Sequence, residues 1–190
     1  MSHFIPGKIV KEFTTKSGKQ AIIRYPKWED IEAMTAYMNT LSTENTFVSF
    51  SGEELSLKEE AEYLGSMFAS MELGDVVKLF CEVENKIVGI SDVRRDVSKR
   101  ERAKHVVIFG ITVAKDFRGD GVGKILAQTV FSEAKQMIPG LKIIWLHCFA
   151  SNTNALALYE KLGFREVGRI PGELLYKSEY IDGVQMTLSV

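Results

Sequence analysis

The chain has 190 residues, of which 45% are hydrophobic and 26% charged, as in an ordinary globular protein. This length suits one domain with a substantial core, so we expect a single domain over residues 1–190. The 24 basic and 25 acidic residues leave a formal net charge of −1, without the basic excess of a typical nucleic-acid-binding protein. We therefore expect no nucleic-acid partner.

Cysteine usage and hydropathy restrict the compartment. Cys81 and Cys148 stand in separate apolar stretches without a Cys-x-x-Cys motif, so neither a disulfide framework nor a zinc site is expected. No apolar run reaches the ~20 residues needed to cross a bilayer, and residues 1–11 lack the pattern of a signal peptide. The sequence predicts a cytoplasmic protein with no membrane partner and no bound metal.

In chain order, the sequence predicts a mixed α/β domain. Eight segments have the composition or period of strands: 8–14, 20–25, 76–84, 87–94, 105–113, 141–149, 164–170 and 179–190. Four segments have helical spacing: 28–41, 56–70, 122 to the Pro139-Gly140 stop, and 155–162. Residues 42–54 and 96–102 are expected to be irregular, and Asp182-Gly183 to interrupt the last strand. We expect a central, twisted, mostly antiparallel sheet of about seven strands, flanked by helices.

A glycine-rich turn, Arg118-Gly119-Asp120-Gly121-Val122-Gly123, lies between the strand at 105–113 and the following helix. Such a turn presents unpaired N–H groups at the positive end of the helix dipole and suits a pyrophosphate, although it can also be a purely structural connection. Glycines let the backbone approach the phosphates, and Arg118 adds a positive charge. A P-loop would need Gly at Arg118 and Ser or Thr at Ile125, and a dinucleotide fingerprint would need Gly at Leu126.

A second motif follows the next strand: Asn152-x-x-Ala155-x-x-Leu158-Tyr159-x-Lys161-x-Gly163-Phe164. Together with Thr112-Val113 and the spacing Arg118-x-x-Gly121-x-Gly123, it resembles the GNAT superfamily of N-acetyltransferases across residues 105–167. The resemblance implies a sheet that splays at the coenzyme site. It also implies transfer of an acetyl group from acetyl-CoA to a small-molecule or peptide amine by direct attack in a ternary complex.

The resemblance implies a set of coenzyme contacts. The pantetheine arm would pair with free backbone groups of the strand before the loop, and the pyrophosphate would lie on N–H groups of the loop. Asn152 would bind the pantetheine arm, with a helix cap as its other possible role. The residues concerned are Ile111, Thr112, Val113, Arg118, Gly119, Asp120, Gly121, Val122, Gly123, Lys124, Asn152 and Tyr159.

The same resemblance makes Tyr159 the acid that protonates the leaving thiolate. The unperturbed pKa of a phenol is near 10, so tyrosine is protonated at neutral pH; the alternative is a half-buried helix aromatic. His105 is the candidate general base because an imidazole can accept the amine's proton through water, although a surface role at a strand end stays open. Glu82 and His147 are further candidates, and a mechanism without a dedicated base is the remaining alternative.

The acceptor is the least defined part. By the resemblance, residues 28–69 and 172–184 form the acceptor side, and acids there favour a cationic acceptor such as a polyamine or a peptide amino terminus, unless they face solvent. The side chains considered are Trp28, Phe47, Phe50, Tyr176, Tyr180, Glu44, Glu53, Glu54, Glu173 and Glu179. A homodimer is possible by family habit. Two other functions stay open: a non-catalytic acyl-CoA-binding module and a nucleotide-binding protein.

Overall fold

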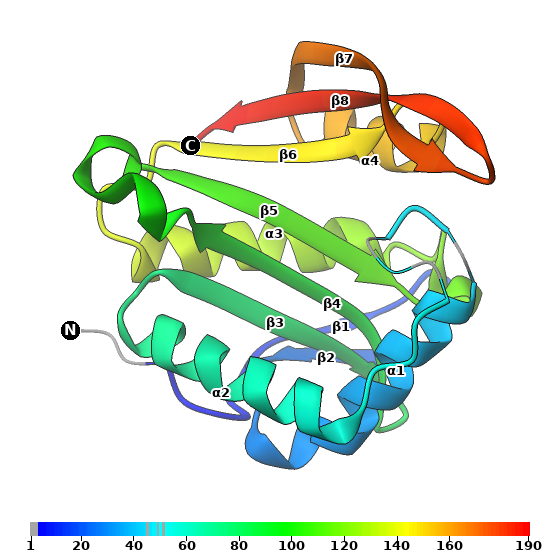
Figure 1. The fold of residues 1–190 in the computed structure, drawn as a ribbon. Coiled ribbons are helices and arrows are strands. Elements are labelled where there is room, and N and C mark those ends of the chain that lie inside the picture. The colour runs from blue at the N-terminus through cyan, green and yellow to red at the C-terminus, as the bar shows by residue number, and fades with distance from the viewer. Residues whose placement is uncertain (1–3, 45, 49, 51) are drawn as a thin grey trace.

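An eight-stranded mixed sheet organises the protein, with helices on both of its faces (Figure 1). The structure is a computed structural model that describes residues 4–44, 46–48, 50 and 52–190. The strand order is β1-β2-β3-β4-β5-β6-β8-β7. The predicted mixed α/β class is confirmed, and the sheet has eight strands where about seven were expected.

The strands are β1 (Ile9–Thr14), β2 (Gln20–Arg24), β3 (Val76–Val83), β4 (Lys86–Arg95), β5 (Val106–Val113), β6 (Ile143–Phe149), β7 (Arg165–Tyr176) and β8 (Glu179–Ser189). The helices are α1 (Ile31–Thr43), α2 (Leu57–Glu72), α3 (Val122–Met137) and α4 (Thr153–Lys161). Three short 3-10 helices complete the described elements: η1 (Trp28–Asp30), η2 (Val97–Ala103) and η3 (Lys115–Phe117).

The sheet opens between β5 and β6. All other neighbouring strands are antiparallel, whereas β5 and β6 run parallel and pair only from Val106↔Ile143 to Ile108↔Trp145. Beyond that point the two strands diverge towards the loop that leads into α3 (Figure 1). Residues 109–113 therefore pair with β4 alone, which confirms the predicted splay.

The helices cover opposite faces of the sheet (Figure 1). α3 lies against β3, β4 and β5, and its apolar stripe includes the fully buried Leu126 and Val130. On the other face α1 contacts β4 and α2 contacts β3. α2 begins at the predicted capping box, in which the Ser56 hydroxyl accepts from the Glu59 N–H and the Glu59 carboxylate accepts from the Ser56 N–H.

Three segments differ from the sequence-based expectations. The region predicted as an irregular connection contains η2, because the Asp96 carboxylate accepts from the Ser98 N–H at 3.2 Å and starts the turn. β7 continues through Pro171 because it is an edge strand, where a residue without an N–H group is tolerated. β8 runs through Gly183 without a break. Within the predicted irregular segment 42–54, residues 45, 49 and 51 lie outside the described residues.

A buried ion cluster joins β2 to β3. The Arg24 side chain donates to both carboxylate oxygens of Asp30, at 2.7 and 2.6 Å, and also to Glu82. Buried charges of this kind are tolerated when each one has a partner of opposite charge. Here Arg24 is the partner of both Asp30 and Glu82. Glu82 therefore has a structural role, and the sequence-based suggestion that it is a general base is not supported.

Candidate active site

A groove with a volume of about 1620 Å³ follows the gap between β5 and β6. Its walls come from β5, β6, the loop before α3, α4, the β7–β8 turn and the connection after α1. Both sequence motifs reach it, the first through Arg118 and Gly121 and the second through Asn152 and Tyr159. The term groove refers to this space throughout. The fold thus brings the two motifs, separated in the chain by α3 and β6, to one site.

Backbone groups of β5 face the gap. The Ala114 N–H donates to the Val88 carbonyl at 2.8 Å. In an antiparallel pair, every second residue directs its backbone groups to the partner strand, so this bond determines which residues of β5 bond to β4. The backbone groups of Thr112 point to β4, whereas those of Ile111 and Val113 point into the gap. Ile111 and Val113 therefore fit the predicted role, and the expectation for the backbone of Thr112 is corrected because its groups belong to the sheet.

The glycine loop leaves the start of α3 uncapped. Gly119 and Gly121 have φ of +79° and +89°, in the left-handed region where glycine has no steric penalty. Gly121 is the residue before the helix, and among the described residues no side-chain capping hydrogen bond is made at this position. The N–H groups there remain available to an anion. Arg118 is held beside the loop, donating to the Val113 carbonyl at 2.9 Å and to Glu44 at 2.6 Å.

The β1–β2 hairpin supports this loop from outside. The Ser17 N–H and hydroxyl donate to the two carboxylate oxygens of Asp120, each at 2.7 Å, and these hydrogen bonds lower the pKa of Asp120. Lys16 donates through Nζ to the Gly119 carbonyl at 3.2 Å and lines the groove. The two strands of this hairpin were predicted from the sequence, but their contact with the glycine loop was not. The side chains of Asp120 and of the fully buried Val122 are structural, so only their backbone groups remain candidates for coenzyme contact.

Tyr159 lies at the wall of the groove on α4. Its side chain is 9% exposed, and its ring meets Phe109 and Phe164 with centroids 6.1 and 6.0 Å away. Burial raises the pKa of Tyr159 above its ordinary value, so the phenol is neutral across the physiological range. Within the described part of the chain its hydroxyl has no hydrogen-bond partner. The environment suits a neutral proton donor.

His105 lies at the wrong end of β5 for the predicted base. Its carbonyl accepts hydrogen bonds from the N–H groups of Lys142 and Ile143, where β5 and β6 are still close together. Eight residues of extended chain, roughly 26 Å, separate it from Val113. His105 does not line the groove, and the expectation is corrected: parallel pairing fixes this end of β5 at the closed end of the gap.

His147 lines the groove instead. Its Nε2 atom lies 2.8 Å from an oxygen of Glu173 in β7, and both side chains are 30% exposed. Space for this pair depends on Gly183 in β8, because a Cβ atom there would overlap both the imidazole and the carboxylate. This explains why the Asp182-Gly183 dipeptide lies within a strand.

The two candidate proton-transfer groups approach the gap from opposite faces of β6. Along β6, Leu146 and Cys148 are buried while His147 between them is open. Tyr159 packs against Phe109, which points to the opposite face of β5 from Ile108 and therefore from Trp145, the partner of Ile108 in β6. Trp145 and His147 share a face of β6. His147 is therefore on the other face, with the gap between them.

A second set of charged residues lines the groove on β3 and β4. Lys78 Nζ lies 3.5 Å from Asp92 and 3.0 Å from the Tyr63 hydroxyl, and Arg94 Nη1 lies 3.2 Å from the other oxygen of Asp92. Burial alone would lower the pKa of Lys78, but the charge of Asp92 and the phenol of Tyr63 outweigh it and raise that pKa. The sequence analysis missed these residues; charges at Lys78 and Asp92 inside apolar strands were the available signal.

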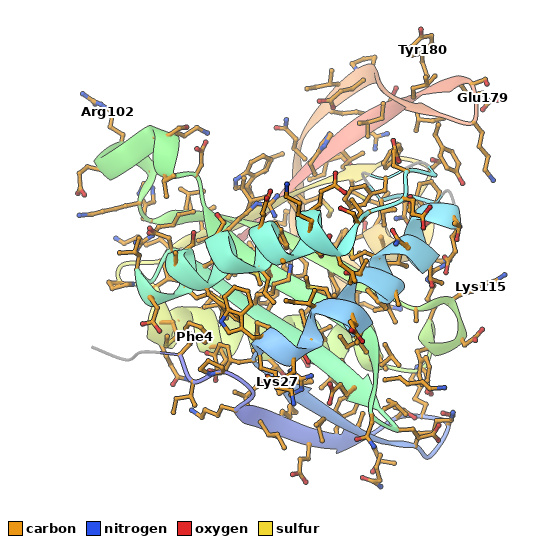
Figure 2. All side chains as sticks on the ribbon, turned by 60° about the horizontal axis from the view of Figure 1, so that its bottom comes forward. Phe4, Lys27, Arg102, Lys115, Glu179 and Tyr180 are labelled. Carbon is orange, nitrogen blue, oxygen red and sulfur yellow. The ribbon has the colours of Figure 1, made fainter. Side chains whose placement is uncertain are left out.

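The predicted acceptor residues separate into two groups. Phe47, in the connection after α1, meets Phe149 and Tyr176 with ring centroids 5.5 and 4.8 Å apart, so aromatic side chains close one end of the groove. Glu179 and Tyr180 instead project from the tip of the β7–β8 hairpin away from the body (Figure 2). Trp28 does not line the groove, and none of the acidic residues considered above is among its described lining residues.

Both cysteines are free and buried, as expected. Cys148 lines the groove, and burial raises the pKa of its thiol to about 11. Among the described residues there is no group of three or more His, Cys, Asp or Glu side chains that could hold a metal ion. None of the helices in that part of the chain is long and apolar enough to span a membrane.

The splayed sheet and its uncapped glycine loop define an acetyltransferase-type α/β protein. Residues 36–164 match the family model of the acetyltransferase (GNAT) family, and the chain belongs to this family. The ribosomal-protein alanine N-acetyltransferase of Escherichia coli is 39% identical over 59 residues, which is 31% of this chain and 38% of that relative.

Solved structures share the fold over nearly the whole chain. A GNAT acetyltransferase from Streptococcus pneumoniae superposes with a TM-score of 0.80 at 25% identity, covering 90% of this chain and 99% of the other. RimJ of Mycobacterium smegmatis, solved with a CoA disulfide, gives a TM-score of 0.76 at 15% identity, covering 100% of this chain and 90% of the other.

Proposed function

We propose that this protein transfers the acetyl group of acetyl-CoA to a primary amine by direct attack in a ternary complex. One observation carries the proposal: the uncapped glycine loop, the neutral phenol of Tyr159 and the imidazole of His147, which contacts Glu173, all line one groove at the β5–β6 gap. Family membership and the relative named for an alanine amino terminus support an amine acceptor, including the terminus of a peptide.

The residues present fit acetyl-CoA. The N–H groups of residues 119–124 suit its pyrophosphate. The gap-facing backbone groups of Ile111 and the N–H of Val113, whose carbonyl already accepts from Arg118, suit the amide-rich pantetheine arm, which would add to β5 as a further strand does. Asn152 caps α4 by accepting from the Ala155 N–H at 3.2 Å. Its amide N–H groups stay available, so the cap and a ligand contact are compatible.

The chemistry requires two proton transfers. A neutral amine attacks the thioester carbonyl carbon, a C–N bond forms, and the C–S bond breaks as the electron pair leaves on sulfur. Tyr159 donates its phenolic proton to the departing thiolate, and His147 accepts the surplus proton of the amine, directly or through a water. The Glu173 carboxylate accepts from Nε2–H of His147, which leaves Nδ1 as the basic nitrogen.

Cys148 supports direct attack over an acetylated-enzyme intermediate. The thiolate is the nucleophilic form of cysteine, and a thiol whose pKa burial has raised to about 11 is almost entirely protonated near pH 7. Although Cys148 borders the groove, it is therefore a poor acetyl acceptor. The amine itself is left as the nucleophile.

The test is a thiol-release assay with acetyl-CoA and a panel of amines, paired with calorimetry using CoA and ATP. We expect CoA binding and amine-dependent thiol release. Binding of CoA without turnover of any amine would indicate the non-catalytic acyl-CoA-binding module instead. Tight ATP binding without CoA binding would indicate a nucleotide-binding protein and would overturn the proposal.

A further inference from the structure

The described lining of the groove is strongly basic, although the whole chain has a net charge of −1. Asp92 is the one acidic residue among the described lining residues. The basic lining residues are Lys16, Lys78, Arg94, Arg118, Lys124, Lys161 and Lys177. Glu44 pairs with Arg118 and Glu173 contacts His147 behind this lining, but the basic residues still outnumber the acidic ones, so the groove favours anions over polycations.

The coenzyme accounts for only part of this charge. Lys16, Arg118, Lys124 and Lys161 lie on the β1–β2 hairpin, the glycine loop, α3 and α4, where the phosphates of acetyl-CoA would lie. Lys78, Arg94 and Lys177 lie elsewhere, on β3, β4 and the β7–β8 turn. These three face the part of the groove left for the second substrate.

Arg94 is the member of this set that can offer two parallel N–H donors to a ligand, because Lys177 has only an ammonium group and lies over the Tyr176 ring. Lys78 is buried and satisfied by Asp92 and Tyr63, whereas the Arg94 side chain is 54% exposed. Its recorded contact uses Nη1 on Asp92, so its other N–H donors have no partner within the described residues. A guanidinium with a free edge binds a carboxylate by two parallel hydrogen bonds.

Asp92 positions Arg94 without cancelling the local charge. Its two oxygens are shared between Lys78 and Arg94, so one negative charge stands between two positive ones. Opposite Asp92 in β5 stands Gly110, which has no side chain to cover the pair. The groove therefore remains open above this row of charges.

The row lies on the same face of the sheet as His147. Arg94 pairs with Ile108 of β5, and Ile108 pairs with Trp145 of β6, two residues before His147. Directly paired residues in neighbouring strands share a face, so the side chains of Arg94, Trp145 and His147 are on one side. Two strand spacings, about 10 Å, separate the backbones of Arg94 and Trp145, and both Arg94 and His147 line the groove.

We infer that the acceptor carries a carboxylate a few bonds from its reactive amine, as an amino acid or an acidic peptide amino terminus does. Arg94 binds that carboxylate and is the specificity-determining residue, and Asp92 is the positioning residue that holds it. The inference rests on the proposed function and replaces the cationic acceptor expected from the sequence, because those acids do not line the groove.

The experiment compares acceptors that differ only in a carboxylate. Thiol release from acetyl-CoA is measured with alanine and alaninamide, with the C-terminally amidated dipeptides Ala-Glu-NH2 and Ala-Gln-NH2, and with putrescine as a dication. We expect kcat/KM to be at least ~10-fold higher for the acid of a pair, in line with a charge-assisted hydrogen bond, and lowest for putrescine. The dipeptide pair separates a peptide acceptor from a free amino acid.

Variants of Arg94 test whether this residue causes the preference for the acid over the amide. Arg94→Gln should bring the acid-to-amide ratio close to one, Arg94→Lys should keep part of it, and acetyl-CoA affinity should not change in either. Arg102→Gln is the matched control, because Arg102 projects outward from η2 (Figure 2) and should leave the ratio unchanged. Equal turnover of acids and amides, or a preference for putrescine, would overturn the inference alone. Failure with every amine would count against the proposed function.

Discussion

At Tyr159, burial favours the neutral phenol, which is also the form that the proposed proton transfer requires. A phenol that donates a proton to a thiolate must be neutral beforehand, and an apolar surrounding stabilises the neutral form. The rings of Phe109 and Phe164 provide that surrounding, while the position of Tyr159 at the groove keeps its hydroxyl within reach of a ligand. The aromatic cluster is therefore as much a part of the proposed site as the hydroxyl.

Tyr159→Phe removes the proton donor and keeps the ring. We expect kcat to fall by at least ~10-fold, the usual lower range for loss of a general acid, with little change in acetyl-CoA affinity. Steady-state thiol release and calorimetry measure the two quantities. Tyr180→Phe is the control, since that side chain is 78% exposed at the hairpin tip. An unchanged kcat would remove Tyr159 from the mechanism.

The His147–Glu173 pair predicts a difference between kcat and KM. His147→Gln should lower kcat by ~10- to 100-fold because the base is lost, and Glu173→Gln should lower it less because only the orienting carboxylate is lost. In both variants KM for the amine and the melting temperature should change little. Glu166→Gln is the control on β7, because its carboxylate binds Arg169 outside the groove. A Glu173→Gln variant that changes stability alone would reduce the pair to a structural contact.

Individual residues of the site were predictable where the motif is local. The spacing from Arg118 to Gly123 and from Asn152 to Phe164 is written in consecutive residues, so sequence alone located the loop and Tyr159. His147, the proposed base, was not predictable in this way. His105 is close to the motif in sequence, but the side of the groove on which a histidine falls depends on where β5 and β6 separate and on the partner that β7 supplies.

At the scale of elements, the β1–β2 hairpin holds the glycine loop in place. Ser17 and Lys16 contact residues more than a hundred positions away, and the Asp120 side chain is the anchor on the loop. The hairpin thereby restricts a loop whose glycines would otherwise make it flexible. Coenzyme affinity should therefore depend on residues that need not touch the coenzyme.

Ser17→Ala tests this dependence. The variant removes the hydroxyl hydrogen bond to Asp120 and keeps the backbone one, so we expect acetyl-CoA to bind about three- to tenfold more weakly, with kcat at saturation nearly unchanged. Calorimetry gives the affinity and thiol release gives kcat. Ser70→Ala is the matched control, because that hydroxyl bonds within α2. Equal affinities for wild type and Ser17→Ala would show that the loop keeps its shape without the hairpin.

Elements with a clear period were predicted close to their bounds, and the misses have physical causes. α3 and β5 carry strong apolar patterns, so their limits were clear. The strand predicted over 164–170 continues through Pro171, because a proline is tolerated on a sheet edge and edge position is a property of the topology. Gly183 suggested a turn, although its small size serves the His147–Glu173 contact within a strand.

For the whole molecule, the buried carboxylate of Glu60 between α2 and the sheet affects the free energy of unfolding. Glu60 of α2 is 6% exposed, and within the described residues its Oε2 atom has no hydrogen-bond partner. Burial raises the pKa of Glu60, and the charge of Lys78 offsets this only in part. An ionised Glu60 therefore costs folding free energy at neutral pH, since the unfolded chain ionises more readily.

The sign of this effect gives a test. Below the ordinary glutamate pKa both states are protonated and the penalty is absent; it grows as pH rises through the raised native pKa and is complete above it. Glu60→Gln should therefore stabilise the protein by about 1 kcal/mol at pH 7.5, or about 2–4 °C in Tm, and have little effect near pH 4. Thermal unfolding at several pH values measures it, with the exposed Glu62→Gln as control. A Glu60→Gln variant that is destabilised at pH 7.5 but not near pH 4 would mean that the ionised carboxylate contributes favourably through Lys78.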